Sequence, residues 1–333
     1  MTEKPVISAR NLSVDFVLSR GFISKTVYLR AVKSVSLEIP KGSFFGLVGE
    51  SGSGKTTLGR AFLKAVPISD GKVHYNDGDV EYDLETLGKK DLKEYRKRAQ
   101  LIFQDPYAAL SPRMTVRDII AEPLEVMGIT SSRDETDERV REIAAKCRLN
   151  LEHLRRFPHA FSGGQRQRIS IARALVSNPR FVVADESVAA LDVSIQADIL
   201  NLLKDLQNEL DLTYLFISHD LSVVAHVCDH IAVMYLGQLV ETAPTRALFN
   251  APRHPYTKAL LSAIPSLDPD QRGNAQKLEG EIPSPTNPPS GCKFHTRCPH
   301  VTDLCQREEP KLENAGDAEH EVACLHWKEL LER

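Results

Sequence analysis

The chain has 333 residues, 26% of them charged and 42% hydrophobic, so it is long enough for one large core or two modest ones and has an ordinary globular composition. Its net charge of −3 gives no basis for general nucleic-acid binding, and no apolar run approaches the ~20 residues of a membrane span. Because the start, MTEKPVISAR, also lacks the apolar stretch of a secretion signal, we expect a protein kept in the reducing cytosol, whose six cysteines are thiols or metal ligands rather than a disulfide framework.

Strand patterns dominate the N-terminal part. Within residues 6–48, SVSLEI alternates apolar and polar positions, and FFGLV is a short buried run that ends at Gly49. A helix is expected from Thr56 to about Val66, and RAQLIFQ predicts a further strand. From Pro106 to about His159, charged helical segments separated by prolines predict an inserted helical subdomain.

Two buried strands, RFVVADE and TYLFISH, flank an amphipathic helix expected over residues 194–210. Strands that alternate with helices in this way imply an α/β protein with a mostly parallel sheet covered on both faces. After Asn250 the composition changes. IPSPTNPPSG at 282–291 is extended and stiffened by proline, and four of the six cysteines follow it.

A phosphate-binding loop is predicted where the first buried strand ends. The segment GESGSGKTT matches G-x-x-x-x-G-K-[ST] and lies between a predicted strand and a predicted helix. Glycines let the backbone wrap phosphates, Lys55 should reach the β- and γ-phosphates, and the Thr56 hydroxyl should bind Mg²⁺. The alternative, a glycine-rich turn that binds nothing, does not explain this placement. The expected ATP-binding residues are Gly49, Glu50, Ser51, Gly52, Ser53, Gly54, Lys55, Thr56 and Thr57.

Polar residues at three other strand ends complement this loop. Asp185 is placed to hold the Mg²⁺ shell, and Glu186 to polarise the attacking water, a role worth roughly 10²–10⁴-fold in rate. Alone, such an acidic pair is often a helix cap. Gln104 is placed to touch both metal and water, and His219 to donate to the γ-phosphate. A lone Gln or His at a strand end is usually structural, so these two count only together with the others.

The segment FSGGQRQR, residues 161–168, has the form of half a phosphate site. Two glycines open a predicted helix, whose N–H groups can hold a phosphate, yet no lysine with a following Ser or Thr completes it. An N-cap serine with a loose glycine start describes the same local geometry. That local interpretation leaves the purpose of the segment open.

Together these motifs resemble the ATP-binding subunit of an ABC transporter over essentially the whole chain: phosphate loop, Q-loop at Gln104, signature FSGGQ, Walker B at 181–186 and H-loop at His219. The resemblance implies a P-loop NTPase fold with a mostly parallel core sheet, an antiparallel β subdomain and an inserted α-helical subdomain. It also implies that the signature closes over ATP held by the phosphate loop of a second subunit, head to tail. The signature residues are Ser162, Gly163, Gly164 and Gln165.

The chain departs from the family pattern at two places. Ser187 follows Glu186 where proline is usual, and Ala189 replaces the serine of the D-loop, whose Asp192 remains. Glu186 is retained, so we expect hydrolysis of ATP. The resemblance places the adenine on an aromatic residue upstream of the phosphate loop. Phe16 matches best, with Tyr28 and Phe22 as rivals, and core or loop packing is the alternative for each.

The C-terminal part resembles that of the second ATPase subunit of oligopeptide/dipeptide importers, through APRHPYTKALLSAIPS, GEIPSPTNPPSGC and four cysteines. This implies import of peptides, although relatives carry nickel, oligosaccharides or opines. We therefore expect an ABC ATPase domain over 1–250, with its helical subdomain at about 106–160, and a small C-terminal domain over 251–333. The four cysteines are Cys292, Cys298, Cys305 and Cys324.

Four thiolates suit a tetrahedral zinc ion or a [4Fe–4S] cluster. Their spacings of five, six and eighteen intervening residues lack the C-x₂-C pairs of structural zinc sites. Some members of the family carry a [4Fe–4S] cluster at equivalent cysteines, so we expect the cluster first, zinc next, and unliganded thiols or disulfides last. Cys147 and Cys228 fall in helical segments and are expected to be buried packing residues. Basic neighbours of the first two cysteines favour thiolates, but solvated loop charges are the plainer interpretation of them: Lys293, His295, Arg297 and His300.

The resemblance also implies partners: a second ATPase chain, with a paralogue favoured over an identical chain, two transmembrane permeases, and indirectly an extracytoplasmic solute-binding protein. The chain is then peripheral on the cytoplasmic face of the membrane, and DPYAALSPRMTV, with Tyr107 and Leu110, is the expected permease contact. A soluble ABC ATPase acting on ribosomes or DNA is the rival. The first kind usually has two cassettes. The second has a long coiled coil, whereas only 106 residues separate Lys55 from Ser162 here. Glu186 and His219 disfavour a third alternative, a non-hydrolysing module.

Overall fold

The computed structural model describes residues 4–19, 27–264, 280–316 and 319–331. The chain forms two compact units. The first unit comprises residues up to 7, 38–43 and 74–217, and the second comprises 8–37, 44–73 and 218 onward. Because the chain passes between the units several times, residues far apart in sequence meet within each of them.

The first unit contains three parallel strands, β6 (Ala99–Ile102), β7 (Phe181–Asp185) and β8 (Thr213–Ser218). Ala99 pairs with Phe181, and Phe181 pairs in turn with Thr213. Every residue of β7 and β8 is buried, which explains why their sequences are continuous apolar runs and not alternating ones. The predicted parallel arrangement of these strands is confirmed.

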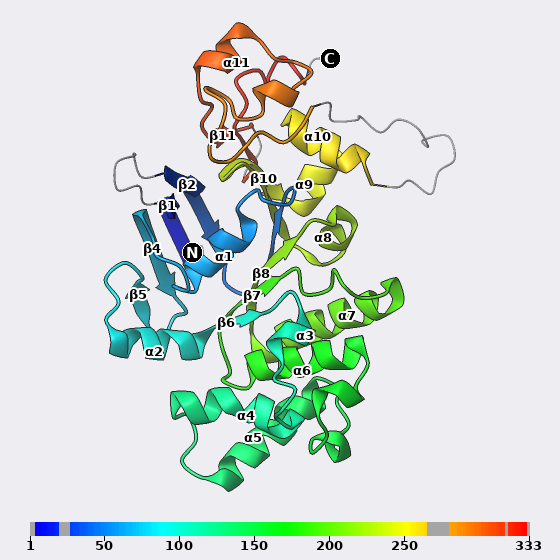
Figure 1. Ribbon diagram of the computed structural model, residues 1–333. Coiled ribbons are helices and arrows are strands. Elements are labelled where there is room, and N and C mark those ends of the chain that lie inside the picture. Colours follow the sequence, from blue (N-terminus) through cyan, green and yellow to red (C-terminus); the bar gives the residue numbers. More distant parts are fainter. Residues whose placement is uncertain (1–3, 20–26, 265–279, 317–318, 332–333) are drawn as a thin grey trace. The chain divides into compact units, whose positions relative to one another are not determined.

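Helices make up most of the remaining first unit, and α4, α5 and α6 lie together (Figure 1). The N-cap Thr115 of α4 accepts a hydrogen bond from the Asp118 N–H, and the N-cap Ser132 of α5 accepts one from the Glu135 N–H. Helix α4 ends at Gly128, which adopts the left-handed conformation. The bounds are α3 (Pro106–Ala109), α4 (Val116–Met127), α5 (Arg133–Lys146), η1 (Leu151–His153), η2 (Pro158–Ala160), α6 (Gly163–Leu175) and α7 (Val193–Leu210).

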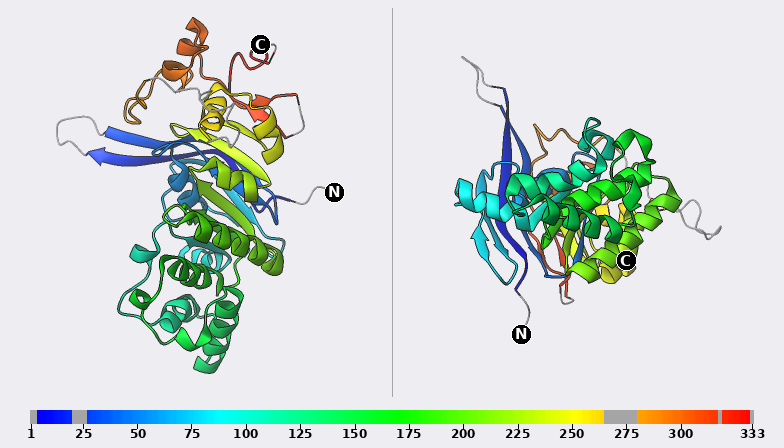
Figure 2. Two further views of the ribbon diagram at one scale, coloured as in Figure 1. Left: turned by 90° about the vertical axis from the view of Figure 1, so that its right-hand side faces the viewer. Right: turned by 90° about the horizontal axis from the view of Figure 1, so that it is seen from below.

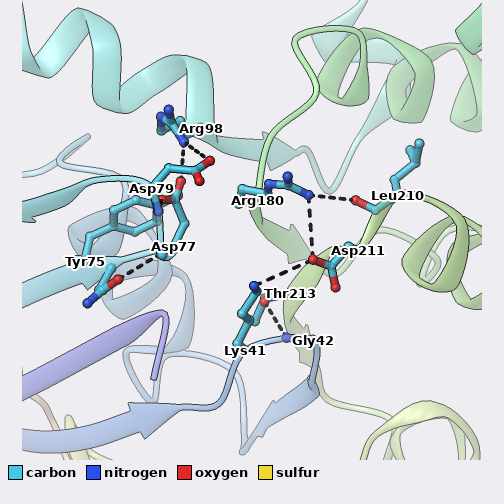
Figure 3. Close-up of polar contacts among 12 residues, drawn as sticks. Lys41, Gly42, Tyr75, Asp77, Asp79, Arg98, Arg180, Leu210, Asp211 and Thr213 are labelled. Atoms are coloured by element: carbon cyan, nitrogen blue, oxygen red, sulfur yellow. Dashed lines mark hydrogen bonds and ion pairs between the residues drawn. The ribbon is translucent and has the colours of Figure 1, made fainter. Parts of the chain in front are cut away.

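Within this unit, residues 74–76 of β4 (Asp70–Asn76) pair antiparallel with β5 (Glu81–Asp83), and the buried carboxylate of Asp77 follows directly. Asp77 accepts hydrogen bonds from the Tyr75 hydroxyl at 2.9 Å and from Arg98, the last residue of α2 (Lys89–Arg98), at 2.6 Å (Figure 3). Burial opposes ionisation of Asp77. The hydrogen bonds from the Val80 N–H, Arg98, Tyr75 and the Asp79 N–H together outweigh it and lower the pKa of the carboxyl.

The second unit contains two long neighbouring strands, β1 (Ile7–Ser19) and β2 (Val27–Ile39), which run side by side (Figure 2). A second group of strands has the order β11-β12-β10-β9-β3. Here β3 is parallel to β9, whereas β10 is antiparallel to both β9 and β12. The bounds are β3 (Phe44–Val48), β9 (His230–Tyr235), β10 (Gln238–Pro244), β11 (Glu313–Asn314) and β12 (Glu321–Val322).

Helix α1 (Lys55–Phe62) follows β3 and is shorter than the sequence predicts. Lys64 adopts a left-handed conformation with φ +51°, and the Ala65 N–H donates to the Arg60 carbonyl, so the chain leaves the helix before Val66. The other helices of the unit are α8 (Leu221–Val227), α9 (Thr245–Asn250), α10 (Pro255–Ser262), η4 (His295–Arg297) and α11 (Asp303–Arg307).

In neither unit does the described part of the chain contain a helix with the length and apolar character needed to cross a membrane.

Candidate functional site

The predicted phosphate loop connects β3 to α1 in the second unit, and its glycines have positive φ angles. A Cβ atom on Gly49 would lie 2.2 Å from the Met234 carbonyl oxygen, and one on Gly54 would lie 2.3 Å from the Ala31 carbonyl oxygen. Both glycines are therefore required by close approach of the backbone as well as by conformation. The loop has the strand–turn–helix context that its sequence predicts.

Lys55 is the first residue of α1 and is only 4% exposed. Its ammonium group donates to the carbonyl oxygens of Gly49 at 2.8 Å and Glu50 at 2.9 Å. Thr56 and Thr57 follow half-buried in the first helical turn. The lysine is thus held inside the curve of the loop, beside the N–H groups that open the helix, which is an arrangement suited to phosphate.

In the first unit, the structure brings Gln104 and Glu186 together. Gln104 follows β6, Glu186 follows β7, and the Gln104 amide donates to the Glu186 carboxylate at 2.9 Å. Asp185, the last residue of β7, is buried. Glu186 has φ +44°, a left-handed conformation that is uncommon outside glycine and is found at functional sites. Its N–H donates to the Ile217 carbonyl, which fixes the turn.

The signature segment begins α6, and Ser162 is its N-cap. The Gln165 N–H donates to the serine hydroxyl, and the Ser162 N–H donates to the Gln165 side chain at 3.1 Å, forming a complete capping box. A Cβ atom on Gly164 would lie 2.6 Å from the Ile195 side chain of α7, whereas one on Gly163 would meet Leu191 at an ordinary 3.6 Å. Close packing of α6 on α7 therefore explains one glycine but not the other.

Comparison with known proteins shows which family carries these motifs. Residues 32–189 match the ABC transporter family, and residues 240–305 match the oligopeptide/dipeptide transporter C-terminal region. A Brucella ovis protein named for peptide import is 48% identical over 325 residues, 98% of this chain and 99% of its own. The chain belongs to the ABC transporter ATP-binding family. It is therefore an ABC-type ATPase, and its α/β fold is the expected one.

Two further comparisons agree with this ABC ATPase assignment. The dipeptide transport ATP-binding protein DppF of Haemophilus influenzae is 46% identical over 323 residues, 97% of each chain. A solved structure of a dimeric ATP-binding cassette, in a post-hydrolysis state bound to ADP and Pi, has 28% identity and a TM-score of 0.62. It covers 72% of this chain and 99% of that one. The solved cassette thus confirms the fold of the greater part of this ABC ATPase.

The remaining predicted site residues of the ABC ATPase that the structure describes lie at exposed or half-buried positions. His219 follows β8 and is exposed, and Asp192 is the exposed N-cap of α7. Of the aromatic residues proposed for adenine, Phe16 is half-buried on β1 and Tyr28 is 58% exposed on β2. Phe22 lies outside the described residues. Neither side chain is fully buried, and the choice between them stays a prediction.

The four C-terminal cysteines of the ABC ATPase line one pocket in the second unit, together with His254, Phe294, His295 and His326. The Cys292 N–H donates to the Cys305 carbonyl at 2.8 Å. Within the described residues, no group of three or more His, Cys, Asp or Glu side chains is arranged so that it could hold a metal ion. The thiols therefore share a pocket without forming a complete ligand shell. Cys147 and Cys228 do not line this pocket and are buried, as predicted.

Burial raises the pKa of three of these four thiols. It raises the pKa of Cys292 to about 11 and that of Cys324 to about 12, and it also raises the pKa of Cys298. The basic neighbours therefore do not hold these three thiols as thiolates. The interpretation of those neighbours as solvated loop charges is wrong for Arg297, whose side chain is only 5% exposed.

Sequence reasoning missed two contacts of the phosphate loop. Arg297 forms an ion pair with Glu50 at 2.6 Å, and the Glu50 N–H donates to the Tyr256 hydroxyl at 2.9 Å. Tyr256 lies in the RHPYT segment, but nothing in that segment indicates its partner. Both contacts join the C-terminal part of the ABC ATPase to its phosphate loop.

Proposed function

We propose that this ABC ATPase is one of two ATP-hydrolysing subunits of a membrane importer of peptides. Peptides are proposed as the substrate because nearly the whole chain is similar to proteins named for peptide and dipeptide import. The similarity includes the oligopeptide/dipeptide transporter C-terminal region. The proposed domains are an ATPase domain over 1–250, with its helical subdomain at about 106–160, and a C-terminal domain over 251–333.

The roles of the residues follow from their chemistry. The phosphate-loop N–H groups and Lys55 bind the ATP phosphates, and His219 donates to the γ-phosphate. Thr56, Asp185 and Gln104 supply the oxygen ligands that Mg²⁺ prefers, and the bound ion neutralises phosphate charge. Glu186 polarises the attacking water. The hydrogen bond from Gln104 fixes the Glu186 carboxylate and supports this assignment.

A second ATPase chain, which we take to be a paralogue, completes the signature side. Ser162 and Gly163 at the start of α6 meet ATP held by that partner, and Asp192 lies at the same seam. The capping box supports this role because it presents the helix N-terminus in a fixed conformation. The dimeric state named for the solved relative supports it as well.

Two permeases hold the chain at the cytoplasmic face of the membrane, and a solute-binding protein delivers the peptide to them. Tyr107, the predicted permease contact, is 63% exposed, and one face of its ring lies under the Arg166 guanidinium at 4.0 Å. Leu110, its predicted companion, is 3% exposed and packs inward instead. Crosslinking from position 107 therefore tests this surface.

Cys292, Cys298, Cys305 and Cys324 are proposed to hold a [4Fe–4S] cluster, with zinc as the alternative. The support is the donor set, four thiols around one pocket, which would have to draw closer together to complete a ligand shell. Because burial raises the pKa of Cys292, Cys298 and Cys324, binding of a cluster or of zinc would release protons from them. Iron and acid-labile sulfide in anaerobically purified protein would establish the cluster, zinc alone would establish the alternative, and absence of both would refute each of them.

The experiment for the function is a pull-down with the tagged Glu186→Gln chain from detergent-solubilised membranes, with and without ATP–Mg²⁺. Recovery of two permeases and a second ATPase is expected, increased by nucleotide. Recovery of the chain alone, or of ribosomes, would overturn the transport assignment. ATP turnover is measured beside it: Glu186→Gln should lose about 10²–10⁴-fold, and the exposed Glu152→Gln should behave as wild type.

A further inference from the structure

Glu50, the second residue of the phosphate loop, is held through its backbone and its side chain. Its N–H donates to the Tyr256 hydroxyl at 2.9 Å, and its carbonyl accepts from Lys55 at 2.9 Å. Its carboxylate accepts two hydrogen bonds from Arg297, at 2.6 Å and 3.0 Å. The position of Glu50 therefore fixes a carbonyl group that contacts the lysine of the phosphate loop.

The pair formed by Arg297 and Glu50 has the geometry of a strong, specific contact. Both terminal nitrogens of the guanidinium engage the two carboxylate oxygens, a bidentate arrangement that lysine cannot reproduce. The Arg297 side chain is 5% exposed and that of Glu50 is 24% exposed, so solvent screens the pair weakly. The Glu50 carboxylate raises the pKa of Arg297 further above its ordinary value.

A second contact reaches Glu50 from the same C-terminal segment. Phe294 is 1% exposed, and its ring centroid lies 5.4 Å from that of Tyr256, whose hydroxyl accepts the Glu50 N–H. It also lies 5.3 Å from the ring of Tyr235. Residues 292–298 thus act on Glu50 twice, directly through Arg297 and by packing through Phe294.

The same seven-residue segment forms one wall of the cysteine pocket. Cys292 and Cys298 bound it, and both line the pocket with Phe294 and His295. Successive backbone hydrogen bonds, from the His295 N–H to Cys292 and from the Arg297 N–H to Phe294, hold the segment in tight turns. Because Arg297 lies inside this short, hydrogen-bonded segment, a shift of the backbone at either cysteine would be transmitted to it.

We propose that Arg297 is a positioning residue for the phosphate loop, through which the state of the cysteine pocket sets the affinity of this chain for ATP. The inference rests on the proposed function, because it takes Lys55 and its loop to be the nucleotide site. It assigns the C-terminal region a part in nucleotide binding within the same chain.

The test is a titration of the purified full chain with a fluorescent ATP analogue, together with KM and kcat for ATP. Arg297→Met and Glu50→Gln should each weaken binding about tenfold, and the double variant should be no weaker than either, because both remove the same contact. KM should rise while kcat stays within about twofold. Arg297→Lys should restore part of the affinity, since it keeps the charge and loses the bidentate geometry.

Arg307→Met is the matched control, an exposed arginine of the same region, and should bind as wild type. If the thermal unfolding midpoint shows that Arg297→Met folds poorly, the affinities of Arg297→Lys and Glu50→Gln for the ATP analogue are used instead. Additive effects of the two single changes, or unchanged affinity in both, would overturn the proposal. Lys55→Ala distinguishes failure of the proposed function from failure of this inference. If Lys55→Ala leaves ATP binding intact, the assignment of the nucleotide site is wrong. If Lys55→Ala abolishes binding and Arg297→Met leaves it unchanged, only the role assigned to Arg297 is wrong.

The pocket is tested by Cys298→Ser in two backgrounds. In the wild-type background it should change the affinity for the ATP analogue at least threefold, and in the Arg297→Met background it should change it by less. Such non-additivity is expected if the effect of Cys298→Ser on ATP affinity depends on the contact made by Arg297. Equal changes in both backgrounds would show that the pocket does not act through Arg297.

Discussion

The Gln104 amide donates a 2.9 Å hydrogen bond to the carboxylate of Glu186, which is 82 residues away in sequence. Gln104→Leu removes this bond to a charged group, so turnover of ATP should fall about 10- to 100-fold because the carboxylate is no longer held in one orientation. Steady-state hydrolysis measures the effect, with the exposed Gln306→Leu as the control. Wild-type turnover in Gln104→Leu would contradict the assigned role.

The two glycines of the signature should respond differently to the same substitution. Gly164→Ala should lower the free energy of unfolding by about 1–3 kcal/mol, because its Cβ would lie 2.6 Å from Ile195. Gly163→Ala meets Leu191 at 3.6 Å and should leave stability unchanged or slightly raised. Denaturant unfolding checks both, and Ile195→Ala should recover part of the loss in Gly164→Ala. Equal stability of the two alanine variants would refute the packing argument.

Acid stability should depend on Asp77. The pKa of this carboxyl is lowered from its ordinary 3.8 in the folded state, so it contributes stability above that pH, and the contribution is lost as pH falls through the lowered value. Asp77→Asn should therefore be less stable than wild type near neutral pH and should lose less stability on acidification below about pH 4. Chemical unfolding followed between pH 7 and pH 3 measures this. Parallel pH profiles for the two proteins would count against it.

Glu241 should be a major source of stability in the second unit. It is fully buried and accepts hydrogen bonds from the Arg253 N–H, the His254 N–H and the His320 ring. Glu241→Ala leaves these donors unsatisfied, at about 1–3 kcal/mol for each that water cannot reach. The thermal unfolding midpoint should fall markedly, whereas Glu321→Ala, at an exposed neighbour on β12, should change it little. A small effect of Glu241→Ala would show that water or other groups replace the carboxylate.

Interactions between residues close in sequence were open to prediction. The serine and glutamine of FSGGQ are three residues apart, as a capping box requires, and the structure shows that box. The apolar runs FFGLV and RFVVADE predict buried strands, which β3 and β7 confirm. The phosphate loop could be located because its glycines, lysine and threonine lie within one short segment. In each case the physical cause is local: a hydrogen bond within one turn, a short continuous run of apolar residues, or a motif contained in one loop.

Tertiary structure alone decided which distant residues meet. Nothing local to Glu50 points to Arg297, 247 residues further along, and nothing in RHPYT points to the Glu50 N–H. Gly164 is required by Ile195 of another helix, and the four cysteines share a pocket only because loops and short strands bring them there. The sequence by itself determined the motifs, the family resemblance and the order of strands and helices, because these depend on near neighbours. The contacts that hold Glu50 and Glu186 depend on the path of the chain between their partners, which no short pattern encodes.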